Sequence, residues 1–452
     1  MTTRRIESKF VCNNCGYEAV KWLGKCPNCG EWDTLVEETM AQAGRRLSPG
    51  VRGEPARIGD ITMTEAVRSP TGTGEFDRVL GGGVVRGSLV LIGGDPGVGK
   101  STLLLQCVGG LVRRGNKVLY ASGEESPEQI KLRAERLGVD AGELYVLSET
   151  NLEAILGSVS ELEPAMVVID SIQTVYHPEL ESAPGSVGQV RECGGLIMRA
   201  AKSGRTAFFI IGHVTKGGVI AGPRTLEHLV DTVLYLEGDL RHQFRILRGV
   251  KNRFGSTNEI GVFQMGQRGL KEVENPSEAF LSERNENSPG AAVTCAIEGS
   301  RPIMIEVQAL VSRANFGLPQ RVATGTDQKR LSMLLAVMER RGGLRIGDQD
   351  VFCNVAGGVR IGETAVDLAV VAALASNYKD RAIARDTIVV GEVGLAGEIR
   401  RVRQMERRIM EARRLGFSRC VCSVADEREA GVEGFGMIGV PDVNGALDML
   451  SI

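Results

Sequence analysis

Short runs of almost wholly apolar residues recur through the middle of the chain, and each has the length of a strand. They are residues 88–93, 117–121, 166–170 and 206–211. Continuous apolar runs of this kind are typical of parallel strands that helices bury on both faces. Residues 102–112 follow the first run and read as the start of a helix. The pattern therefore predicts an α/β domain with a parallel sheet.

The last third of the chain has a different rhythm of strands and helices. A polar, turn-rich stretch at 275–290 precedes it. Strands are predicted at 292–297, 303–311, 352–355 and 387–390. Helices are predicted at 328–340, 364–376 and 404–415. The second helix is so rich in Ala, Val and Leu that it must be nearly buried. This part of the chain is expected to form a separate α+β domain.

Bulk composition narrows the classes of protein. The 452-residue chain has a formal net charge of −2, so any nucleic acid must be bound by local patches and not by a global field. The length suggests about three domains. There is no run of about 18 apolar residues and no secretory leader pattern, so we expect a cytoplasmic protein without membrane contact.

Four cysteines near the start of the chain form two C-x2-C pairs that ten residues separate. They are Cys12, Cys15, Cys26 and Cys29. Each pair precedes a glycine, which permits the tight turn that directs backbone amides towards sulfur. Four thiolates at this spacing suit tetrahedral Zn²⁺, and a redox dithiol pair or an iron site is the alternative. The segment is too small to bury a core, so metal must supply folding energy. Trp22 and Trp32 lie here and are expected to pack over this ribbon.

A glycine-rich stretch with the P-loop pattern G-x-x-x-x-G-K-S joins the first apolar run to its helix. It consists of Gly94, Asp95, Pro96, Gly97, Val98, Gly99, Lys100, Ser101 and Thr102. Glycines let backbone amides converge on phosphate oxygens, and the helix N-terminus adds positive potential. Lys100 is expected to reach the β- and γ-phosphates of ATP, and the Ser101 hydroxyl to bind Mg²⁺. A glycine-rich turn without nucleotide is the alternative, but strand, loop and helix in this order favour ATP.

Polar residues follow the other three apolar runs. Asp170 ends the third run, where an aspartate is expected to orient Mg²⁺ and its water. Glu124 follows the second run and is predicted to activate the attacking water, with Glu125 as the alternative base. Glutamate is also favoured near a helix N-terminus, which is the plainer interpretation. His213 follows the fourth run, at the place of either a γ-phosphate sensor or an ordinary polar residue.

Two cations and two loops complete the predicted ATPase domain. Lys251 and Arg253 are two positions apart in an extended segment, so their side chains point the same way. This suits contact with a neighbouring subunit's γ-phosphate, as an arginine finger makes, or a surface pair of cations. Residues 176–190 and 216–224 read as mobile loops that track a nucleic-acid backbone, or as ordinary surface loops.

The cysteine ribbon, the P-loop and the pentapeptide KNRFG at 251–255, in this order, resemble the bacterial RadA/Sms DNA-repair family over the whole chain. The resemblance implies a RecA-like core, organised similarly to replicative helicases of the DnaB type. It implies a ring, a hexamer, that tracks single-stranded and branched DNA. It also implies branch migration driven by ATP hydrolysis, RecA as a partner, and Lys251 and Arg253 acting across the subunit interface. His213 stands where those relatives carry glutamine.

The last third resembles the proteolytic domain of Lon protease. Lon-type hydrolysis needs a serine–lysine dyad, and the matching positions hold Ala365 and Glu406. Alanine has no nucleophile and glutamate is no amine base. We therefore expect a domain without peptidase activity that serves ring assembly and DNA contact. Seven arginines between 400 and 414 provide positive charge for phosphates or form a solvated helix face. Cys420 and Cys422 are expected to be buried free thiols.

Together these features predict four segments and an α/β fold. We expect a zinc ribbon at 1–37, a linker at 38–57, a RecA-like ATPase domain at 58–275 and a peptidase-inactive Lon-like α+β domain at 276–452. The expected function is that of a DNA-stimulated ATPase of helicase type in recombinational repair, with ATP, Mg²⁺ and Zn²⁺ as cofactors. An ATP-dependent Lon-like protease and a non-motor scaffold or kinase on a RecA-like core are the alternatives. Peptide hydrolysis would favour the protease. ATP hydrolysis at a rate that single-stranded DNA does not change would favour the scaffold or kinase.

Overall fold

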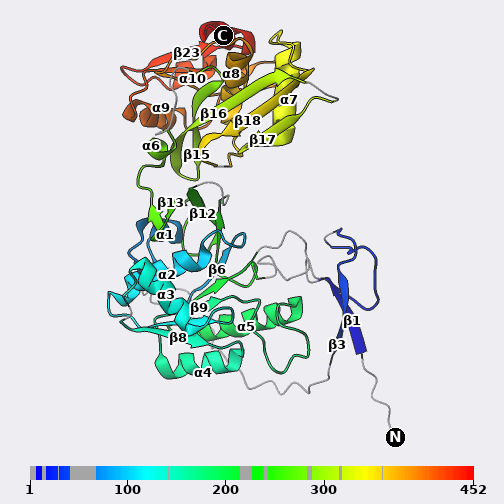
Figure 1. Cartoon of the computed structure of the whole chain (residues 1–452), viewed down its shortest axis with the longest axis vertical. Helices are drawn as coiled ribbons and strands as arrows, with labels where there is room; N and C mark the ends of the chain where they lie inside the picture. Colours follow the sequence, from blue (N-terminus) through cyan, green and yellow to red (C-terminus); the bar gives the residue numbers. More distant parts are fainter. Residues whose placement is uncertain are drawn as a thin grey trace. The chain divides into compact units, whose positions relative to one another are not determined.

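The structure is a computed structural model, shown in Figure 1 with its elements labelled. It describes residues 7–12, 17–28, 30–40, 57, 68–140, 142–213, 226–238, 243–281, 288–314, 318–358 and 360–452. The chain divides into two compact units. The first is Met1–Glu237 with Arg245–Thr257 and Phe263–Glu272; the second is Gly238–Phe244, Asn258–Val262 and Val273–Ile452. Two short segments before residue 276 therefore pack with the second unit, and the predicted domain limits stay predictions.

The N-terminal ribbon is a small antiparallel sheet with strand order β2-β1-β3. Its strands are β1 (Glu7–Cys12), β2 (Glu18–Ala19) and β3 (Leu35–Met40). β1 pairs with β3 along its whole length, from Glu7 opposite Met40 to Cys12 opposite Leu35. Because β3 reaches Met40, the strand overruns the predicted start of the linker at residue 38.

A nine-stranded sheet forms the ATPase core, with the order β14-β13-β12-β11-β6-β10-β9-β7-β8. The parallel strands are β6 (Leu89–Gly93), β7 (Val118–Ser122), β8 (Leu144–Ser148), β9 (Met166–Asp170), β10 (Ala207–Ile211) and β11 (Thr232–Glu237). The antiparallel edge is β12 (Phe244–Asn252), β13 (Ile260–Gly266) and β14 (Gly269–Glu272). The four apolar runs are confirmed as strands to within one residue at each end, and the α/β fold class is confirmed.

Helices cover both faces of this sheet (Figure 1). They are α1 (Gly74–Leu80), α2 (Lys100–Val112), α3 (Pro127–Leu137), α4 (Leu152–Leu162) and α5 (Val187–Ser203), with a small hairpin of β4 (Arg68–Ser69) and β5 (Val84–Val85). Successive residues of a strand face opposite ways. Val90 and Ile92 therefore enter the core under α2 and α3, whereas Leu89 and Leu91 enter the core under α4 and α5.

The second unit is built on a seven-stranded sheet of order β17-β18-β16-β15-β19-β22-β23. Its strands are β15 (Ala291–Glu298), β16 (Arg301–Arg313), β17 (Arg321–Thr324), β18 (Gln349–Val355), β19 (Thr387–Val389), β22 (Arg419–Ser423) and β23 (Gly436–Val440). A separate two-stranded ladder joins β20 (Glu392–Val393) to β21 (Ile399–Arg400). The sheet mixes antiparallel and parallel pairs, as expected of an α+β domain.

Helices again lie on both faces of this second sheet. They are α6 (Pro276–Leu281), α7 (Gln328–Arg340), α8 (Asp367–Tyr378), α9 (Met405–Arg414), α10 (Val424–Glu429) and α11 (Val443–Met449). The core under α7, α8 and α11 is separate from the core under α9. The helix predicted at 364–376 begins as a 3-10 turn, Thr364–Val366, and α8 is almost wholly buried, as predicted. Cys420 and Cys422 are buried free thiols, also as predicted.

Candidate nucleotide-binding and hydrolysis site

The P-loop lies between β6 and α2, at the carboxyl edge of the parallel strands. Gly94, Gly97 and Gly99 have φ values of 148°, 78° and 113°, which side-chain-bearing residues rarely adopt. A Cβ at Gly94 would stand 2.4 Å from the Leu236 carbonyl oxygen of β11. The glycines therefore allow the loop to turn tightly against the neighbouring strand, so that its amides remain available to phosphate.

Lys100 begins α2 and is turned back onto the loop. Its side chain is 3% exposed, and Nζ donates hydrogen bonds to the carbonyl oxygens of Gly94 (2.8 Å) and Asp95 (3.0 Å). Burial lowers the pKa of Lys100, and the negative charge of Asp170 opposes that shift. The ammonium group is thus held at the mouth of the loop, where the β- and γ-phosphates of a nucleotide would lie.

Asp170 ends β9 and is held by Tyr120 of the adjacent strand β7. The Tyr120 hydroxyl donates a 2.6 Å hydrogen bond to Asp170 Oδ2, and the two side chains are buried. Burial and the charge of Asp170 raise the pKa of Tyr120 well above its usual value, so the phenol keeps its proton. With Oδ2 engaged in this way, the carboxylate has a fixed orientation towards the site.

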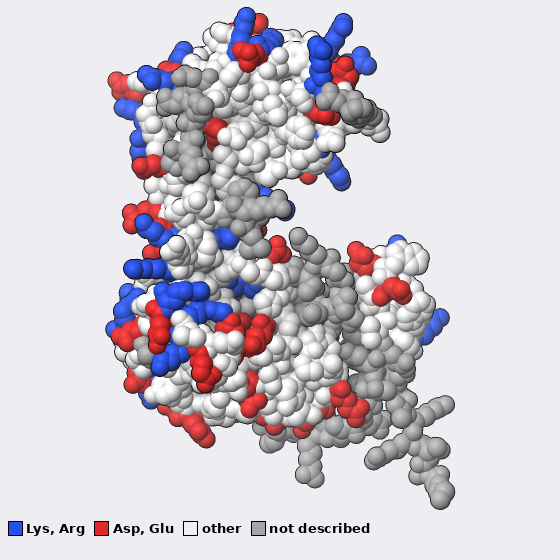
Figure 2. All heavy atoms as spheres, viewed as in Figure 1, with Lys and Arg blue, Asp and Glu red and all other residues white. Residues whose placement is uncertain are grey.

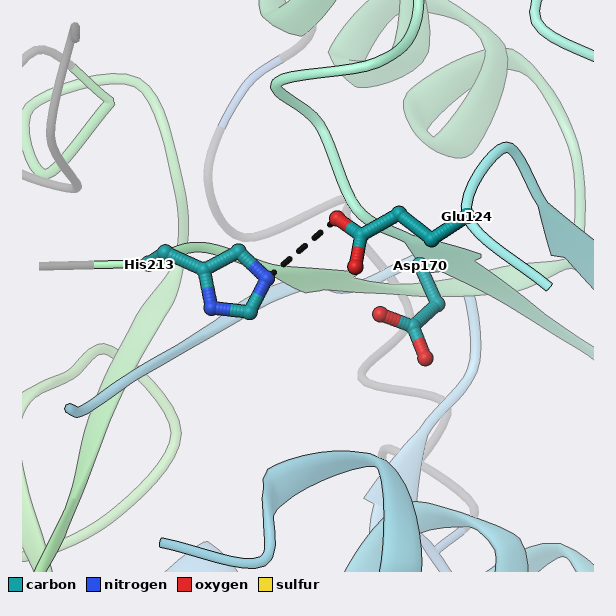
Figure 3. Close-up of side chains that lie close together, drawn as sticks. All are labelled: Glu124, Asp170 and His213. Carbon is teal, nitrogen blue, oxygen red and sulfur yellow. Dashed lines mark ion pairs between the residues drawn. The ribbon is translucent and has the colours of Figure 1, made fainter. Parts of the chain in front are cut away.

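Glu124 lies in the turn between β7 and α3, and Figure 3 shows it beside Asp170 and His213. The Ser171 hydroxyl donates to Glu124 Oε1 (2.5 Å), and His213 Nε2 lies 3.3 Å from the same oxygen. The His213 hydrogen bond lowers the pKa of Glu124 to about 2, against the effect of burial and with help from Ser171. A carboxylate ionised at neutral pH and fixed at one oxygen can accept a hydrogen bond from an attacking water.

The neighbouring Glu125 is committed elsewhere. Its side chain forms an ion pair with Arg133 of α3. The backbone amides of Glu124 and Glu125 both donate to the Ser122 hydroxyl oxygen. The two residues therefore have similar backbone hydrogen bonds and differ in the contacts of their side chains. The geometry therefore favours Glu124 over Glu125 as the base, which the sequence left open.

Oxygen ligands for Mg²⁺ are present at this site. Ligand atoms of Glu124, Asp170 and His213 all lie within 4.8 Å of one another. Mg²⁺ prefers carboxylate, hydroxyl and phosphate oxygens, so Asp170 and Ser101 are the residues that would hold it, with His213 outside that set. When bound, the ion neutralises charge on the phosphates of ATP.

Arg253 lies towards the amino ends of the parallel strands, away from the P-loop, and Lys251 lies two strands from β6, in register with Leu91 through Val233. Lys251 is at the end of β12, and its Nζ donates to the Glu227 carbonyl oxygen (2.7 Å). Arg253 donates to Asp231 Oδ1 (3.2 Å), and the Leu89 amide donates to Oδ2 of the same carboxylate (3.0 Å). Leu89 is the first residue of β6. The structure therefore does not bring these two cations to the P-loop of their own chain.

One of the two loops predicted to be mobile is held by a buried side chain. Gln189 of α5 accepts from the His177 amide (2.8 Å), and its Nε2 donates to the carbonyl oxygens of His177, Leu180 and Ser182. The described loop at 177–186 is thus bonded to the helix that follows it. The other loop, 216–224, lies outside the described residues.

The ribbon buries the first cysteine of each pair. Cys12 and Cys26 belong to one small core cluster, and Gly30 takes the left-handed φ of 74° that its turn requires. The two buried thiols lie in one cluster, and such a cluster fits a metal ion. Cys15 and Cys29 lie outside the described residues, so the set of four zinc ligands stays a prediction.

The second unit has no serine–lysine dyad at the matched positions. Ala365 is buried and Glu406 is exposed on α9. Of the predicted basic cluster, Arg408 is wholly buried and pairs with Glu363, so it cannot contact DNA. Arg400, Arg401 and Arg414 also pair with carboxylates. On the face drawn in Figure 2, cations and acids are interspersed.

The fold and the site together define a RecA-like P-loop ATPase with an N-terminal zinc ribbon and a C-terminal domain of ChlI or Lon type. Family models agree: the rubredoxin metal binding domain matches residues 10–37, the AAA domain residues 60–219, and subunit ChlI of Mg-chelatase residues 308–426.

The DNA repair protein RadA of Bacillus subtilis is 54% identical over 450 residues, 98% of each chain. The RadA of Listeria monocytogenes is 54% identical over 422 residues, 93% of this chain and 92% of its own. The RadA of Halalkalibacterium halodurans is 49% identical over 451 residues, 98% of each chain. The chain belongs to the family of DNA repair protein RadA.

Sequence reasoning missed the residues that orient the site. Tyr120, Ser171 and Asp231 each bond to a residue that was predicted, but none belongs to a motif that spacing alone reveals. The pairing register of β7 with β9 is the signal that could have identified Tyr120. Ser122 lies opposite Asp170 and Tyr120 lies opposite Val168, so Tyr120 is two residues from the partner of Asp170 and faces the same way. Within the described part of the chain, no helix has the length and apolar character needed to cross a membrane.

Proposed function

We propose that this protein is an ATP-driven motor of recombinational DNA repair that works as a ring, a hexamer, on single-stranded and branched DNA. Its ATP hydrolysis is stimulated by DNA and drives branch migration of recombination intermediates, with RecA as a partner. The family to which the chain belongs, its RecA-like ATPase core and the arrangement of Lys100, Glu124 and Asp170 beside the P-loop support this proposal. Zn²⁺ in the ribbon and Mg²⁺ with ATP are its cofactors.

The observation that carries the proposal is the position of Lys251 and Arg253. Arg253 is bonded to Asp231, which in turn is bonded to Leu89 at the start of β6. From Leu89 to Gly94 the strand rises about 17 Å, at about 3.3 Å per residue. Arg253 cannot cover this distance and also keep its place in the fold, and the Lys251 ammonium is turned to the Glu227 carbonyl oxygen. They serve the nucleotide of a neighbouring subunit, which requires an assembly with shared sites.

Asp231 makes the transfer of Arg253 to a neighbour's phosphate feasible. The carboxylate is buried and also accepts a 2.7 Å hydrogen bond from Lys202 Nζ of α5. When Arg253 leaves for a phosphate, Lys202 remains as the partner of Asp231. A buried carboxylate without any cation would be strongly destabilising, and this second cation avoids that penalty.

Hydrolysis then rests on five residues. Lys100 binds the β- and γ-phosphates, and Asp170 with Ser101 would hold Mg²⁺. Glu124 orients the attacking water and takes its proton, while its ionised state at neutral pH keeps it ready to do so. Charge that develops on the γ-phosphate is stabilised by Arg253 of the neighbour.

Mixing two inactive variants tests the proposal. Lys100→Ala removes the phosphate-binding ammonium, and Arg253→Ala removes the proposed finger; each should abolish DNA-stimulated hydrolysis when alone. In an equimolar mixture, about a quarter of interfaces pair an intact P-loop with an intact finger, so part of the activity should return. Arg248→Ala is the matched control, because Arg248 lies on β12 but pairs with Glu237. A mixture that assembles and stays inactive would refute the shared site, and hydrolysis indifferent to DNA would refute the motor.

A further inference from the structure

Both tryptophans of the protein are on the surface of the ribbon. Trp22 is 53% exposed and Trp32 is 70% exposed, and the chain has no other tryptophan. This corrects the expectation that they pack over the ribbon. The small core of the ribbon consists of Cys12, Cys26 and Leu35, with other apolar residues packed against it. The indoles thus leave most of their apolar area in water, at a cost to the free energy of the isolated chain.

The two indoles lie close to each other and share one glycine. A Cβ on Gly24 would stand 3.6 Å from the Trp22 ring and 3.7 Å from the Trp32 ring. Gly24 is fixed in place because its carbonyl oxygen accepts a 2.8 Å hydrogen bond from the Asp33 amide. The two rings therefore flank one point of the backbone and form a single aromatic surface.

A cation belongs to the same surface. Lys25 forms an antiparallel bridge with Trp32, and its Nζ lies 5.6 Å from the centre of the Trp32 ring. Partners that lie directly opposite in a bridge share a face. Because successive residues of an extended segment point opposite ways, Glu31 is directed away from the face of Trp32 and Lys25. The surface is thus aromatic and cationic, and Lys21 next to Trp22 is exposed as well.

We propose that Trp22, Trp32 and Lys25 form a stacking platform for the unpaired bases of single-stranded DNA. The inference rests on the proposed action on DNA and gives the ribbon a direct part in it. Every base has a π-face, so adjacent exposed indoles bind bases without regard to sequence, and a nearby ammonium binds the phosphate backbone. Duplex DNA keeps its bases stacked on one another, so it does not offer these faces.

The tryptophan content of the chain gives a direct readout. Intrinsic tryptophan fluorescence of the full-length, zinc-loaded protein reports on this surface alone, without a label. Oligothymidylate should quench the emission saturably, and a duplex of equal length should not. The single-tryptophan variants Trp22→Phe and Trp32→Phe should each keep part of the quenching. Replacing both with alanine should weaken binding of oligothymidylate roughly 5- to 150-fold per stacked base.

Controls separate stacking from loss of fold and from the motor itself. Tyr145→Ala removes an exposed aromatic on β8 of the ATPase core and should leave DNA binding unchanged. Zinc content of the double alanine variant should equal that of the wild type.

If saturating oligothymidylate stimulates ATP hydrolysis but leaves the fluorescence unchanged, the platform is refuted and the motor stands. If the fluorescence responds only to another protein such as RecA, the surface is a protein-docking site and the proposal is wrong. If DNA neither stimulates hydrolysis nor quenches, both proposals fall.

Discussion

The hydrogen bond between Tyr120 and Asp170 predicts how strongly the ATPase depends on Mg²⁺. Tyr120 is 1% exposed and Asp170 is 5% exposed, and the bond is 2.6 Å long. Tyr120→Phe removes one oxygen atom and keeps the ring, so packing between β7 and β9 is preserved. The change leaves Asp170 Oδ2 without this donor in a buried position.

The size of the effect follows from the charge of the acceptor. A hydrogen bond to an ionised group contributes about 1.5–3 kcal/mol, more than a bond between neutral groups. If that energy is lost from the orientation of Asp170, the affinity for Mg²⁺ falls by about 10- to 150-fold, at about 1.4 kcal/mol per tenfold change. Sufficient Mg²⁺ should restore hydrolysis, because Lys100 and Glu124 are untouched.

The assay is a Mg²⁺ titration of nucleotide binding, with a fluorescent ATP analogue that is not hydrolysed. The Tyr120→Phe variant should need about tenfold more Mg²⁺ or more for half-saturation, while binding without Mg²⁺ stays unchanged. Tyr145→Phe is the matched control, since its hydroxyl donates to Glu143 (3.0 Å) on the exposed edge of the sheet. An unaltered Mg²⁺ dependence in Tyr120→Phe, with thermal stability equal to that of the wild type, would refute the reasoning.

Three further predictions follow from the ion pairs of the structure. Glu124→Gln should slow ATP hydrolysis by about 10²- to 10⁴-fold with nucleotide binding retained, whereas Glu125→Gln should cost less than about tenfold; the reverse order would identify the wrong base. His213→Ala should raise the pKa of Glu124 from about 2 towards its usual value of about 4.3, so the acid limb of the rate profile should move to higher pH. An unmoved limb would show that His213 does not set this pKa. Glu363→Ala should lower the free energy of unfolding by about 3–5 kcal/mol in denaturant titrations, because it leaves the buried Arg408 without its partner; a loss below about 1 kcal/mol would contradict this.

The strands of the ATPase core were predictable because each is a continuous apolar run. Buried parallel strands need apolar residues on both faces, and β6, β7, β9 and β10 have no exposed residue. Their order was not predictable from such runs. β10 lies between β6 and β9 because of pairings between distant segments, such as Phe208 with Leu89 and with Val167.

The site was predictable as far as motifs carry it and no further. The P-loop, Asp170 and the pair of glutamates come from local patterns, but the choice of Glu124 depends on contacts with distant residues. His213 contacts Glu124, whereas Glu125 forms an ion pair with Arg133. The seven arginines in α9 and in the segment just before it look alike in the sequence. Arg408 differs because it lies on the buried face of α9, where it bonds to Glu363 and to the Cys295 carbonyl oxygen on distant segments.

The P-loop and Arg253 lie at different ends of the same strands, so each subunit has two unlike contact surfaces. A subunit that receives a finger on one side and offers its own on the other is joined to its neighbours head to tail. All subunits of the proposed ring therefore point the same way around it, and no two-fold axis relates neighbours. In this ring, one Lys100→Ala subunit should disable a single site, whereas its finger should still serve the next subunit. In the proposed ring, such an asymmetric contact would give a sense of rotation to hydrolysis that passes from one subunit to the next, before any DNA is bound.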